Sequence, residues 1–594
     1  MLRYRVEPAD RSAHLFRVSL TLPQPEACVV LRLPVWIPGS YLIREFARHL
    51  SGVDARQGER RLVVTALDKA SWQIEGCDPT QTLVLSWQVY AFDTSVRTAY
   101  LDERRAFFNG TSLFPAWVGH EHEPHQVELA GWPADWQVAT AMNPVGDGSD
   151  RLWQAADHDE LIDHPFELGT FWRGRFEVAG VPHDLVVSGA GPQADLARLL
   201  TETQQICAEQ IRFWHGEGGC PPFERYVFLL NVVQDGYGGL EHRASTALLA
   251  SRKDLPRRAV SGAAASSTRT DGHVTLLGLI SHEYFHTWNV KRLRPRVFVP
   301  YALDREAYTG LLWFYEGFTS YYDDLMLRRC GLIDPATYLK LLTKTVQQVL
   351  ATPGRWVQSL SEASFDAWIK YYRPDENTAN ATVSYYTKGS LVALALDLAL
   401  RASGVDGATL DALMHRLWQR SAAADHRIGT EQDDIRAALA AVAGLEHAAG
   451  LLALLESAVN GCEDLPLPTL LSALGIDWRS ESGSWSQRLG LRLTESGGAL
   501  KVQSVARGGV AESAGVSAGD EWLALAGWRV RQISDADALG VAEQPLELLC
   551  VRDQRVLLLT LPTVSAEAGQ QVKLLPVAEP VEPARALRRA WLGA

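Results

Sequence analysis

Residues 282–286 read His282-Glu283-Tyr284-Phe285-His286, and the interpretation of the whole sequence starts from this stretch. Two histidines four residues apart lie on one side of an α-helix, one turn above the other. Zinc prefers imidazole nitrogens and a carboxylate, and a catalytic zinc keeps a fourth position for water. Glu283 could take a proton from that water. The stretch therefore predicts a zinc-binding helix with its own general base. The alternative is a chance match of two core histidines and a surface glutamate.

The residues around this stretch favour a buried helix. Apolar side chains recur at about 100° per residue on a stripe roughly opposite the two histidines. These are Leu277, Ile280, Tyr284 and Trp288. Asp271 and Gly272 can open the helix, and Pro295 lies just beyond its expected end. The basic run at residues 291–294 is expected to complement the helix C-terminus, with attraction of anionic substrates as the alternative.

A third metal ligand is expected from a separate, later helix. Residues 313–322 form an apolar and aromatic run that contains one carboxylate, Glu316. A lone carboxylate is costly to bury unless it is paired or bound to a metal. Glu316 is therefore the predicted third ligand, with the solvated face of an amphipathic helix as the alternative. Asp323 or Asp324 could orient a ligand histidine from behind.

The hydrophobic periodicity changes along the 594 residues, which are too many for one core. A period of two dominates the beginning, as in residues 16–22 and 83–89, and helical periodicity dominates residues 272–475. The predicted fold is multidomain α+β. Its predicted parts are an N-terminal antiparallel β-sandwich (1–170), a mostly α-helical catalytic domain (171–480), a small domain of short strands and turns (487–563) and a C-terminal tail (564–594).

Composition and charge exclude several classes. A formal net charge of -13 argues against a general nucleic-acid binder, which would present a basic surface. Seven scattered cysteines without a CxxC pair indicate reduced thiols rather than a disulfide framework. The sequence contains no run of about 18 apolar residues, so no membrane span is predicted, and it does not begin with an apolar leader. We therefore expect a cytoplasmic protein, or a periplasmic one if a leader is missing from this sequence.

HEYFHTWNVKRLRP (282–295), followed by WFYEGFTSYY (313–322), resembles the glycyl aminopeptidase family of PDZ-containing zinc metallopeptidases. These enzymes are gluzincins related to aminopeptidase N and thermolysin. The resemblance covers nearly the whole chain and implies a β-rich N-terminal domain, a thermolysin-like catalytic domain and a C-terminal PDZ domain. It also implies one Zn²⁺ per chain on His282, His286 and Glu316. The implied substrates are peptides with a free N-terminus, preferably a small residue, glycine or alanine.

Two further segments match the relatives residue by residue. GGLEH (238–242) stands where aminopeptidase N relatives carry a Gly-Ala-Met-Glu-Asn strand, whose Glu binds the substrate α-amine. This match implies that role for Glu241, with Gly238 and Gly239 beside the substrate. YTKG (386–389) resembles a Tyr-Glu-Lys-Gly segment and implies that Tyr386 stabilises the oxyanion. The sequence departs from aminopeptidase N in two ways. Residues 238–242 are GGLEH rather than Gly-Ala-Met-Glu-Asn, and the spacing between the second histidine and the third ligand is longer.

The residues themselves leave both roles open. Glu241 follows a strand-like run and a glycine-rich turn, where backbone can approach a substrate closely. A carboxylate against an ammonium in a partly dehydrated cleft is a strong contact, but an ordinary loop carboxylate is the alternative. Tyr386 precedes a helical run and could be a core aromatic, and Tyr385 is a rival for the role of oxyanion donor.

Residues 488–530 resemble a bacterial PDZ domain. Leu489-Gly490-Leu491 matches the carboxylate-binding loop, whose N–H groups would grip a peptide C-terminus as a strand is added to the sheet. Two other functions stay open. One is a zinc endopeptidase with the same metal core, and the other is a PDZ adaptor with a non-catalytic metal site. The sequence does not indicate an oligomeric state.

Overall fold

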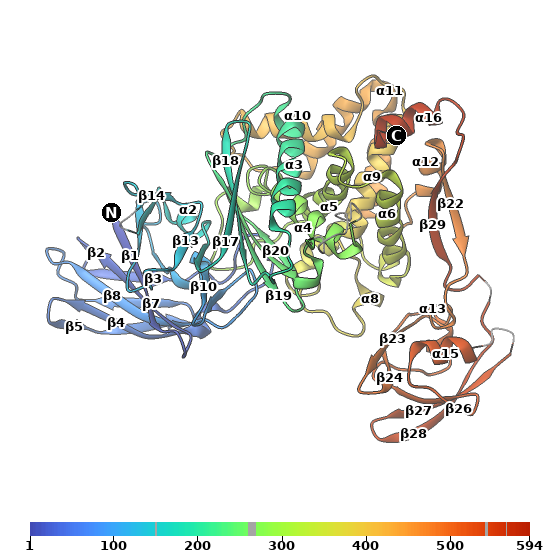
Figure 1. Ribbon diagram of the computed structural model, residues 1–594, viewed down its shortest axis with the longest axis horizontal. Helices are drawn as coiled ribbons and strands as arrows, with labels where there is room; N and C mark the ends of the chain where they lie inside the picture. Colours follow the sequence, from blue (N-terminus) through green and yellow to red (C-terminus); the bar gives the residue numbers. More distant parts are fainter. Residues whose placement is uncertain (149–150, 259–268, 541–543, 566, 594) are drawn as a thin grey trace. The chain divides into compact units, whose positions relative to one another are not determined.

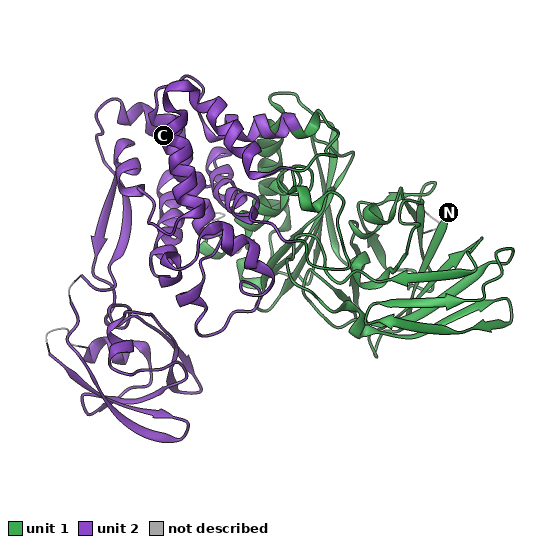
Figure 2. Ribbon diagram, turned by 180° about the vertical axis from the view of Figure 1, so that it is seen from behind, with its two compact units in different colours: residues 1–307, 421–429 green, residues 308–420, 430–594 purple. Residues whose placement is uncertain are grey.

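The computed structural model describes residues 1–148, 151–258, 269–540, 544–565 and 567–593 (Figure 1). Outside the described residues lie 149–150 of the predicted N-terminal domain, 259–268 of the predicted catalytic domain, 541–543 of the predicted PDZ domain, and 566 and 594 of the predicted tail. The chain divides into two compact units (Figure 2). Unit 1 holds Met1–Ala307 and Ser421–Gly429, and unit 2 holds Tyr308–Arg420 and Thr430–Ala594. The domain limits given above stay a prediction.

An eight-stranded sheet dominates the N-terminal part of unit 1. Its strands lie in the order β14 (Asn143–Pro144), β15 (Leu152–Ala155), β12 (His125–Leu129), β1 (Leu2–Asp10), β2 (Leu15–Leu22), β8 (Leu83–Tyr90), β4 (Leu50–Gln57) and β5 (Arg60–Leu62). Burial alternates along β2 and β8, as the period of two predicts. β1 and β12 pair in parallel, so this pair departs from the antiparallel arrangement predicted. Alternation along a strand fixes which face is buried but not which strand lies alongside.

Two four-stranded sheets complete this β-rich part. One has the order β11 (Ala116–Trp117), β3 (Cys28–Arg32), β7 (Ser71–Glu75), β6 (Val64–Asp68), and the other β13 (Gln137–Ala139), β16 (Phe166–Gly169), β10 (Arg105–Phe108), β9 (Ala99–Leu101). Leu20, Leu31 and Phe166 come one from each of the three sheets and belong to the same buried cluster, so the sheets share a core. The short helical elements are η1 (Phe46–His49), α1 (Gly110–Leu113) and α2 (His158–Ile162).

The rest of unit 1 is a five-stranded mixed sheet with two long helices. Its order is β17 (Trp172–Val178), β18 (Val181–Ser188), β19 (Tyr226–Val233), β21 (Ser245–Ser251), β20 (Tyr237–Glu241), so β20 is an edge strand paired antiparallel with β21. α3 (Leu196–His215) and α4 (Asp271–Phe285) lie against each other, and α4 also contacts β20 and β21 (Figure 1). GGLEH therefore lies largely on a strand, next to the helix that carries the two histidines.

Unit 2 begins as a group of helices. They are α5 (Leu312–Arg329), α6 (Pro335–Leu350), α7 (Leu360–Phe365), α8 (Thr378–Ala381), α9 (Thr387–Ala402), α10 (Leu410–Ala422), α11 (Gln432–Asn460) and α12 (Leu467–Ala473). α5 and α9 pack closely because two glycines meet at their crossing. A Cβ on Gly317 would lie 2.6 Å from Cα of Gly389. The predicted helical part is thus confirmed.

α11 is long and apolar enough, by length and composition alone, to cross a membrane, where the sequence predicts no span. The helix is interrupted at Gly444, whose φ of 73° and ψ of 165° are not helical. A spanning helix needs about 20 consecutive residues, and neither half of α11 reaches that length. The interruption at Gly444 therefore leaves two shorter helical halves in place of one continuous span-length helix.

The C-terminal part of unit 2 contains a separate β-sheet with its own core. Its strands are β23 (Leu491–Ser496), β24 (Ala499–Val505), β25 (Glu521–Leu525), β26 (Trp528–Arg529), β27 (Leu546–Arg552) and β28 (Arg555–Leu561), with α13 (Trp485–Arg488), α14 (Val510–Ser513) and α15 (Ile533–Leu539). Leu500, Trp522 and Leu548 lie in its buried cluster. β22 (Ile476–Glu481) pairs with β29 (Gln571–Pro576), and α16 (Ala584–Leu592) follows. The identity of this β-rich part as a PDZ domain stays a prediction.

Candidate metal centre

α4 forms where the sequence predicts it, holds His282, and is followed directly by His286 as its C-cap. Thr270 caps its N-terminus, with Oγ1 accepting a hydrogen bond from the backbone N–H of His273 at 3.1 Å. Leu277, Ile280 and Tyr284 are buried as expected. The helix ends at Phe285, however, so Trp288 lies beyond it and is buried from the following turn. His286, at the C-cap, keeps helical backbone angles.

A backbone hydrogen bond fixes the tautomer of His286. Its Nδ1 lies 2.7 Å from the backbone carbonyl oxygen of Asn289, which can only accept, so Nδ1 carries the proton and Nε2 carries the lone pair. That Nε2 lies 3.0 Å from Nε2 of His282. Two imidazole nitrogens therefore converge on one point, with the tautomer of one ring fixed by the backbone.

Three side chains have the composition of a metal site. His282, His286 and Glu316 each offer one ligand atom, and these atoms all lie within 4.8 Å of one another. His286 and Glu316 are buried and His282 is partly buried. Two imidazoles and one carboxylate are a ligand set typical of catalytic zinc, so these residues fit the metal that the sequence predicts.

The backbone of β20 lies directly against the predicted base. A Cβ on Gly239 would overlap the carboxylate of Glu283, whereas a Cβ on Gly238 would come no closer than 3.8 Å, to Nη1 of Arg97. Glu283 itself is only 5% exposed. Glycine at position 239 is therefore required for the strand to approach the base, and the turn expected before Glu241 is instead a strand.

Glu241 is buried beside a residue from the distant N-terminal part of unit 1. Gly39 has a φ of +92°, and a Cβ there would overlap the carboxylate of Glu241. Lys291 is a nearby charge. Burial acts to lower the pKa of Lys291, but the carboxylate of Asp163 outweighs this and raises it, and Glu241 acts in the same direction. The implied amine anchor is thus held between a glycine and a cation that the sequence did not associate with it.

Asp163 is the centre of a buried polar network. Its Oδ1 accepts from the Lys291 ammonium at 2.7 Å and lies 3.1 Å from Nδ1 of His242, and its Oδ2 accepts from the backbone N–H of Arg243 at 3.0 Å. Burial acts to raise the pKa of Asp163, but Lys291 and Arg243 hold it well below its ordinary range. The network ties the end of β20 to the turn after α4. Lys291 is thus engaged in a buried ion pair rather than complementing a helix end.

Four tyrosines of unit 2 form a cluster, and two of them, Tyr371 and Tyr386, interact electrostatically with Glu316. Tyr386 stacks on Tyr385 and Tyr371, and its hydroxyl lies 3.5 Å from that of Tyr372. Burial, followed by the charge of Glu316, raises the pKa of Tyr386 above its ordinary value. Tyr385 is fully buried whereas Tyr386 is partly exposed. Sequence reasoning missed Tyr371 and Tyr372, although a second Tyr-Tyr pair in the same loop region could have drawn attention to them.

The predicted carboxylate loop lies between α13 and β23. The N–H of Leu489 donates to the carbonyl oxygen of Trp485, and the N–H of Gly490 donates to that of Gln487, both at 3.0 Å. Two of the three N–H groups expected to grip a peptide C-terminus are therefore used within the α13 turn. Leu491 begins β23. Peptide binding at this loop stays a prediction.

Comparison with known proteins bears on the whole chain. Residues 3–170 match the Peptidase M61 N-terminal domain, and residues 275–392 match M61 glycyl aminopeptidase. An aminopeptidase N family protein from Idiomarina loihiensis, known from its crystal structure, is 36% identical, with 100% of both chains covered and a TM-score of 0.91. No curated protein matches the chain.

A more distant solved structure is an M1 zinc metallopeptidase from Deinococcus radiodurans. It is 16% identical, the match covers 79% of this chain and 94% of that one, and the TM-score is 0.45. The two family matches and the likeness over the full length agree with the motifs on α4 and β20. The chain belongs to the M61 glycyl aminopeptidase family and is a metallo-aminopeptidase.

Proposed function

We propose that this aminopeptidase uses one zinc ion per chain, held by His282, His286 and Glu316, to remove N-terminal residues from peptides. The observation that carries the proposal is the convergence of two imidazole nitrogens at 3.0 Å, one with its tautomer fixed by a backbone carbonyl, together with a carboxylate ligand atom within 4.8 Å of both. The family description, glycyl aminopeptidase, supports a preference for an N-terminal glycine, and we propose alanine beside it as the next smallest residue.

Glu283 acts as the general base in this proposal. Zinc supplies a Lewis acid and lowers the pKa of water towards neutrality. Glu283 takes the proton from the attacking water and passes it to the nitrogen of the leaving amine. Its carboxylate is held against the backbone of β20 at Gly239, so the base has a defined position before substrate arrives.

Glu241 and Tyr386 bind two different groups of the substrate, the terminal ammonium and the scissile carbonyl oxygen. The carboxylate of Glu241 accepts hydrogen bonds from the ammonium of the substrate terminus, and the buried surroundings strengthen this contact. The hydroxyl of Tyr386 donates to the oxyanion that develops on the scissile carbonyl. A peptide whose chain extends on the N-terminal side of the residue to be removed presents an amide nitrogen to Glu241 in place of an ammonium. The enzyme therefore acts as an exopeptidase.

Metal analysis with an activity assay tests this proposal. We expect one zinc per chain, loss of aminoacyl-nitroanilide hydrolysis on chelation, and recovery when zinc is added back. Glu316→Ala should lose zinc and activity while circular dichroism shows a folded protein. A folded wild-type protein that cleaves substrate fully after its metal has been removed and verified absent would contradict the proposal.

The endopeptidase and adaptor alternatives give different results in the same assay. Wild-type protein should prefer a free over an N-acetylated terminus, and Glu241→Gln should remove most of that preference. Equal cleavage of both substrates by the wild type would favour the endopeptidase. Bound zinc without any hydrolysis of either substrate would favour a PDZ adaptor with a non-catalytic metal site.

The choice between the two adjacent tyrosines is a separate prediction. Tyr386→Phe is expected to lower kcat about 10²- to 10³-fold, the usual cost of removing one oxyanion donor. Tyr385→Phe, the matched variant, is expected to stay close to wild type because Tyr385 is fully buried, whereas Tyr386 is partly exposed. Steady-state kinetics on both variants measure this. The reverse order of effects would assign the role to Tyr385.

We also propose that the C-terminal β-rich part is a PDZ domain. Support comes from the Leu489–Leu491 match, from the six-stranded sheet and from its separate buried core. Strand addition would occur along β23, whose pairing with β24 leaves its other edge for a peptide.

A further inference from the structure

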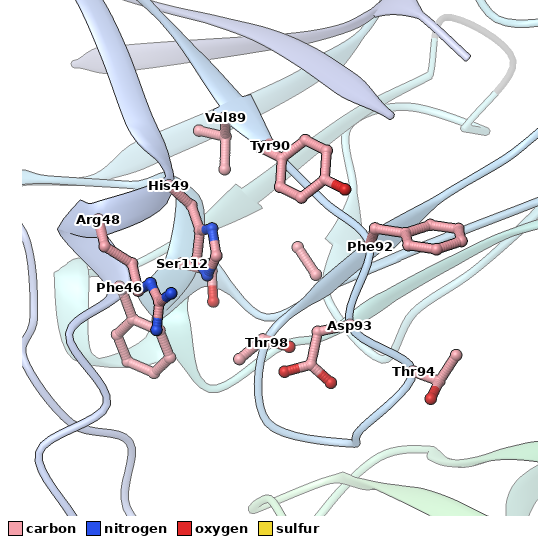
Figure 3. Close-up of a pocket in the computed structure, with 11 residues that line it drawn as sticks. Phe46, Arg48, His49, Val89, Tyr90, Phe92, Asp93, Thr94, Thr98 and Ser112 are labelled. Atoms are coloured by element: carbon pink, nitrogen blue, oxygen red, sulfur yellow. The ribbon is translucent and has the colours of Figure 1, made fainter. Parts of the chain in front are cut away.

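A cavity of about 370 Å³ opens in the N-terminal part of unit 1, among residues that the reaction does not use (Figure 3). It is lined by η1, by the end of β8 and the loop after it, and by Ser112 of α1. Phe46 and Val89 are buried in its wall, whereas Tyr90 and Phe92 are about half exposed. The cavity thus combines an apolar interior with an aromatic rim, as small-molecule sites do.

Two hydroxyl groups in the wall have no hydrogen-bond partner among the described residues. Oγ of Ser112 and Oγ1 of Thr98 are buried, and neither makes a hydrogen bond to any residue in the described part of the chain. Ser112 is only 5% exposed. A buried polar atom without a partner is destabilising, so such atoms are normally satisfied by a ligand or by water. We therefore expect a polar group of a ligand, or water, to form hydrogen bonds with both hydroxyls.

Charges of opposite sign stand on two walls of the cavity. Arg48 belongs to η1, and Asp93 belongs to the loop after β8 (Figure 3). Within the described ranges, neither forms an ion pair with the other or with a third residue. Asp93 uses Oδ1 to accept from the backbone N–H of Ser95 at 2.8 Å, which leaves Oδ2 for another donor. A cation and an anion that face one cavity without neutralising each other suit a ligand that carries both charges.

His49 lines the same cavity, is influenced by both charges, and adds a neutral polar group. Burial and the Arg48 guanidinium lower the pKa of His49, while Asp93 acts in the opposite direction. Its ring is therefore mostly uncharged near neutral pH and can donate one hydrogen bond and accept another. A simple anion would be repelled by Asp93, and a simple cation by Arg48, because the cavity carries no excess of either charge.

We propose that this cavity is a second, non-catalytic site for a free α-amino acid with an apolar side chain. Arg48 binds the carboxylate, Asp93 binds the ammonium, and Phe46 and Tyr90 contact the side chain. Ser112 and Thr98 complete the hydrogen bonds of the polar end. The volume lies at the low end of small-molecule sites, which suits one amino acid rather than a peptide segment. Such a ligand is the product class of an aminopeptidase, so the site would sense product.

Isothermal titration of the full-length, zinc-loaded protein with L-phenylalanine tests the proposal. N-acetyl-L-phenylalanine lacks the ammonium and L-phenylalaninamide lacks the carboxylate, so each is expected to bind at least tenfold more weakly than L-phenylalanine. Arg48→Met should weaken the binding of L-phenylalanine at least tenfold, so that L-phenylalanine no longer binds more tightly than L-phenylalaninamide. In Asp93→Asn, L-phenylalanine should no longer bind more tightly than N-acetyl-L-phenylalanine. This crossed pattern assigns each charge to its own partner.

Two further variants separate this site from the catalytic one. Glu241→Gln removes the proposed amine anchor at the metal and should leave this binding intact. Arg17→Met, an exposed arginine on β2, is the matched control and should bind as wild type does. No binding of L-phenylalanine, or equal binding by wild type, Arg48→Met and Asp93→Asn, would overturn the proposal and leave water as the partner of the two hydroxyls.

Discussion

Glu283→Gln is expected to lower kcat about 10²- to 10⁴-fold for aminoacyl-nitroanilide hydrolysis, while zinc stays bound. Glutamine has the shape of glutamate and fits the same place against β20, but its amide cannot take a proton from water. Because Glu283 is not among the three proposed ligands, the metal content should not change. Steady-state kinetics together with metal analysis of the purified variant measure both quantities.

Two companion variants show whether the loss belongs to the base. Glu177→Gln replaces an exposed glutamate of β17 and is expected to leave kcat unchanged. Gly239→Ala inserts a methyl group where the Glu283 carboxylate lies, so it should displace the base and also lower kcat, with the fold intact by circular dichroism. Wild-type turnover by Glu283→Gln would remove this residue from the mechanism.

Local sequence patterns predicted the placement of those candidate site residues that depend on a single helix. The spacing of His282 and His286 requires only the helical repeat, and α4 follows it. Burial of Glu316 follows from the apolar run around it, because a strongly apolar helix has no solvated face to offer. The predicted Tyr386 precedes α9 and lies near Glu316 because Gly317 and Gly389 bring the two helices together. In each case the signal lay within a few residues of the side chain.

Contacts between distant segments could not be predicted in this way. Gly39 approaches Glu241 from about 200 residues earlier in the chain, and nothing near Gly39 in the sequence points to a carboxylate. Asp163 lies 128 residues before Lys291, so the basic run after α4 was interpreted from its nearest helix end. The parallel pairing of β1 with β12 has the same cause, since alternation specifies a buried face and not a neighbour.

Lys291→Met is expected to lower the free energy of unfolding by about 3 kcal/mol, because it removes the cation nearest to the buried carboxylate of Asp163 and leaves the more distant Arg243, whose Nε lies 3.6 Å from Oδ2. Lys291 and Asp163 are 3% and 7% exposed and lie 2.7 Å apart, so water does not replace the lost partner easily. The pKa of Asp163 should rise, because burial alone raises it. Urea denaturation at pH 7 measures the stability.

A surface ion pair provides the matched control for this change. Lys253 and Asp235 lie 3.7 Å apart and are mostly exposed, so Lys253→Met should alter the free energy of unfolding by no more than about 0.5 kcal/mol. The double variant Lys291→Met with Asp163→Asn removes both buried charges and should recover part of the loss, since no unpaired ion then remains. A double variant that is less stable than Lys291→Met would contradict this explanation. An amide at position 163 would then satisfy His242 and Arg243 worse than the carboxylate does, and the ion pair with Lys291 would not be the source of the stability.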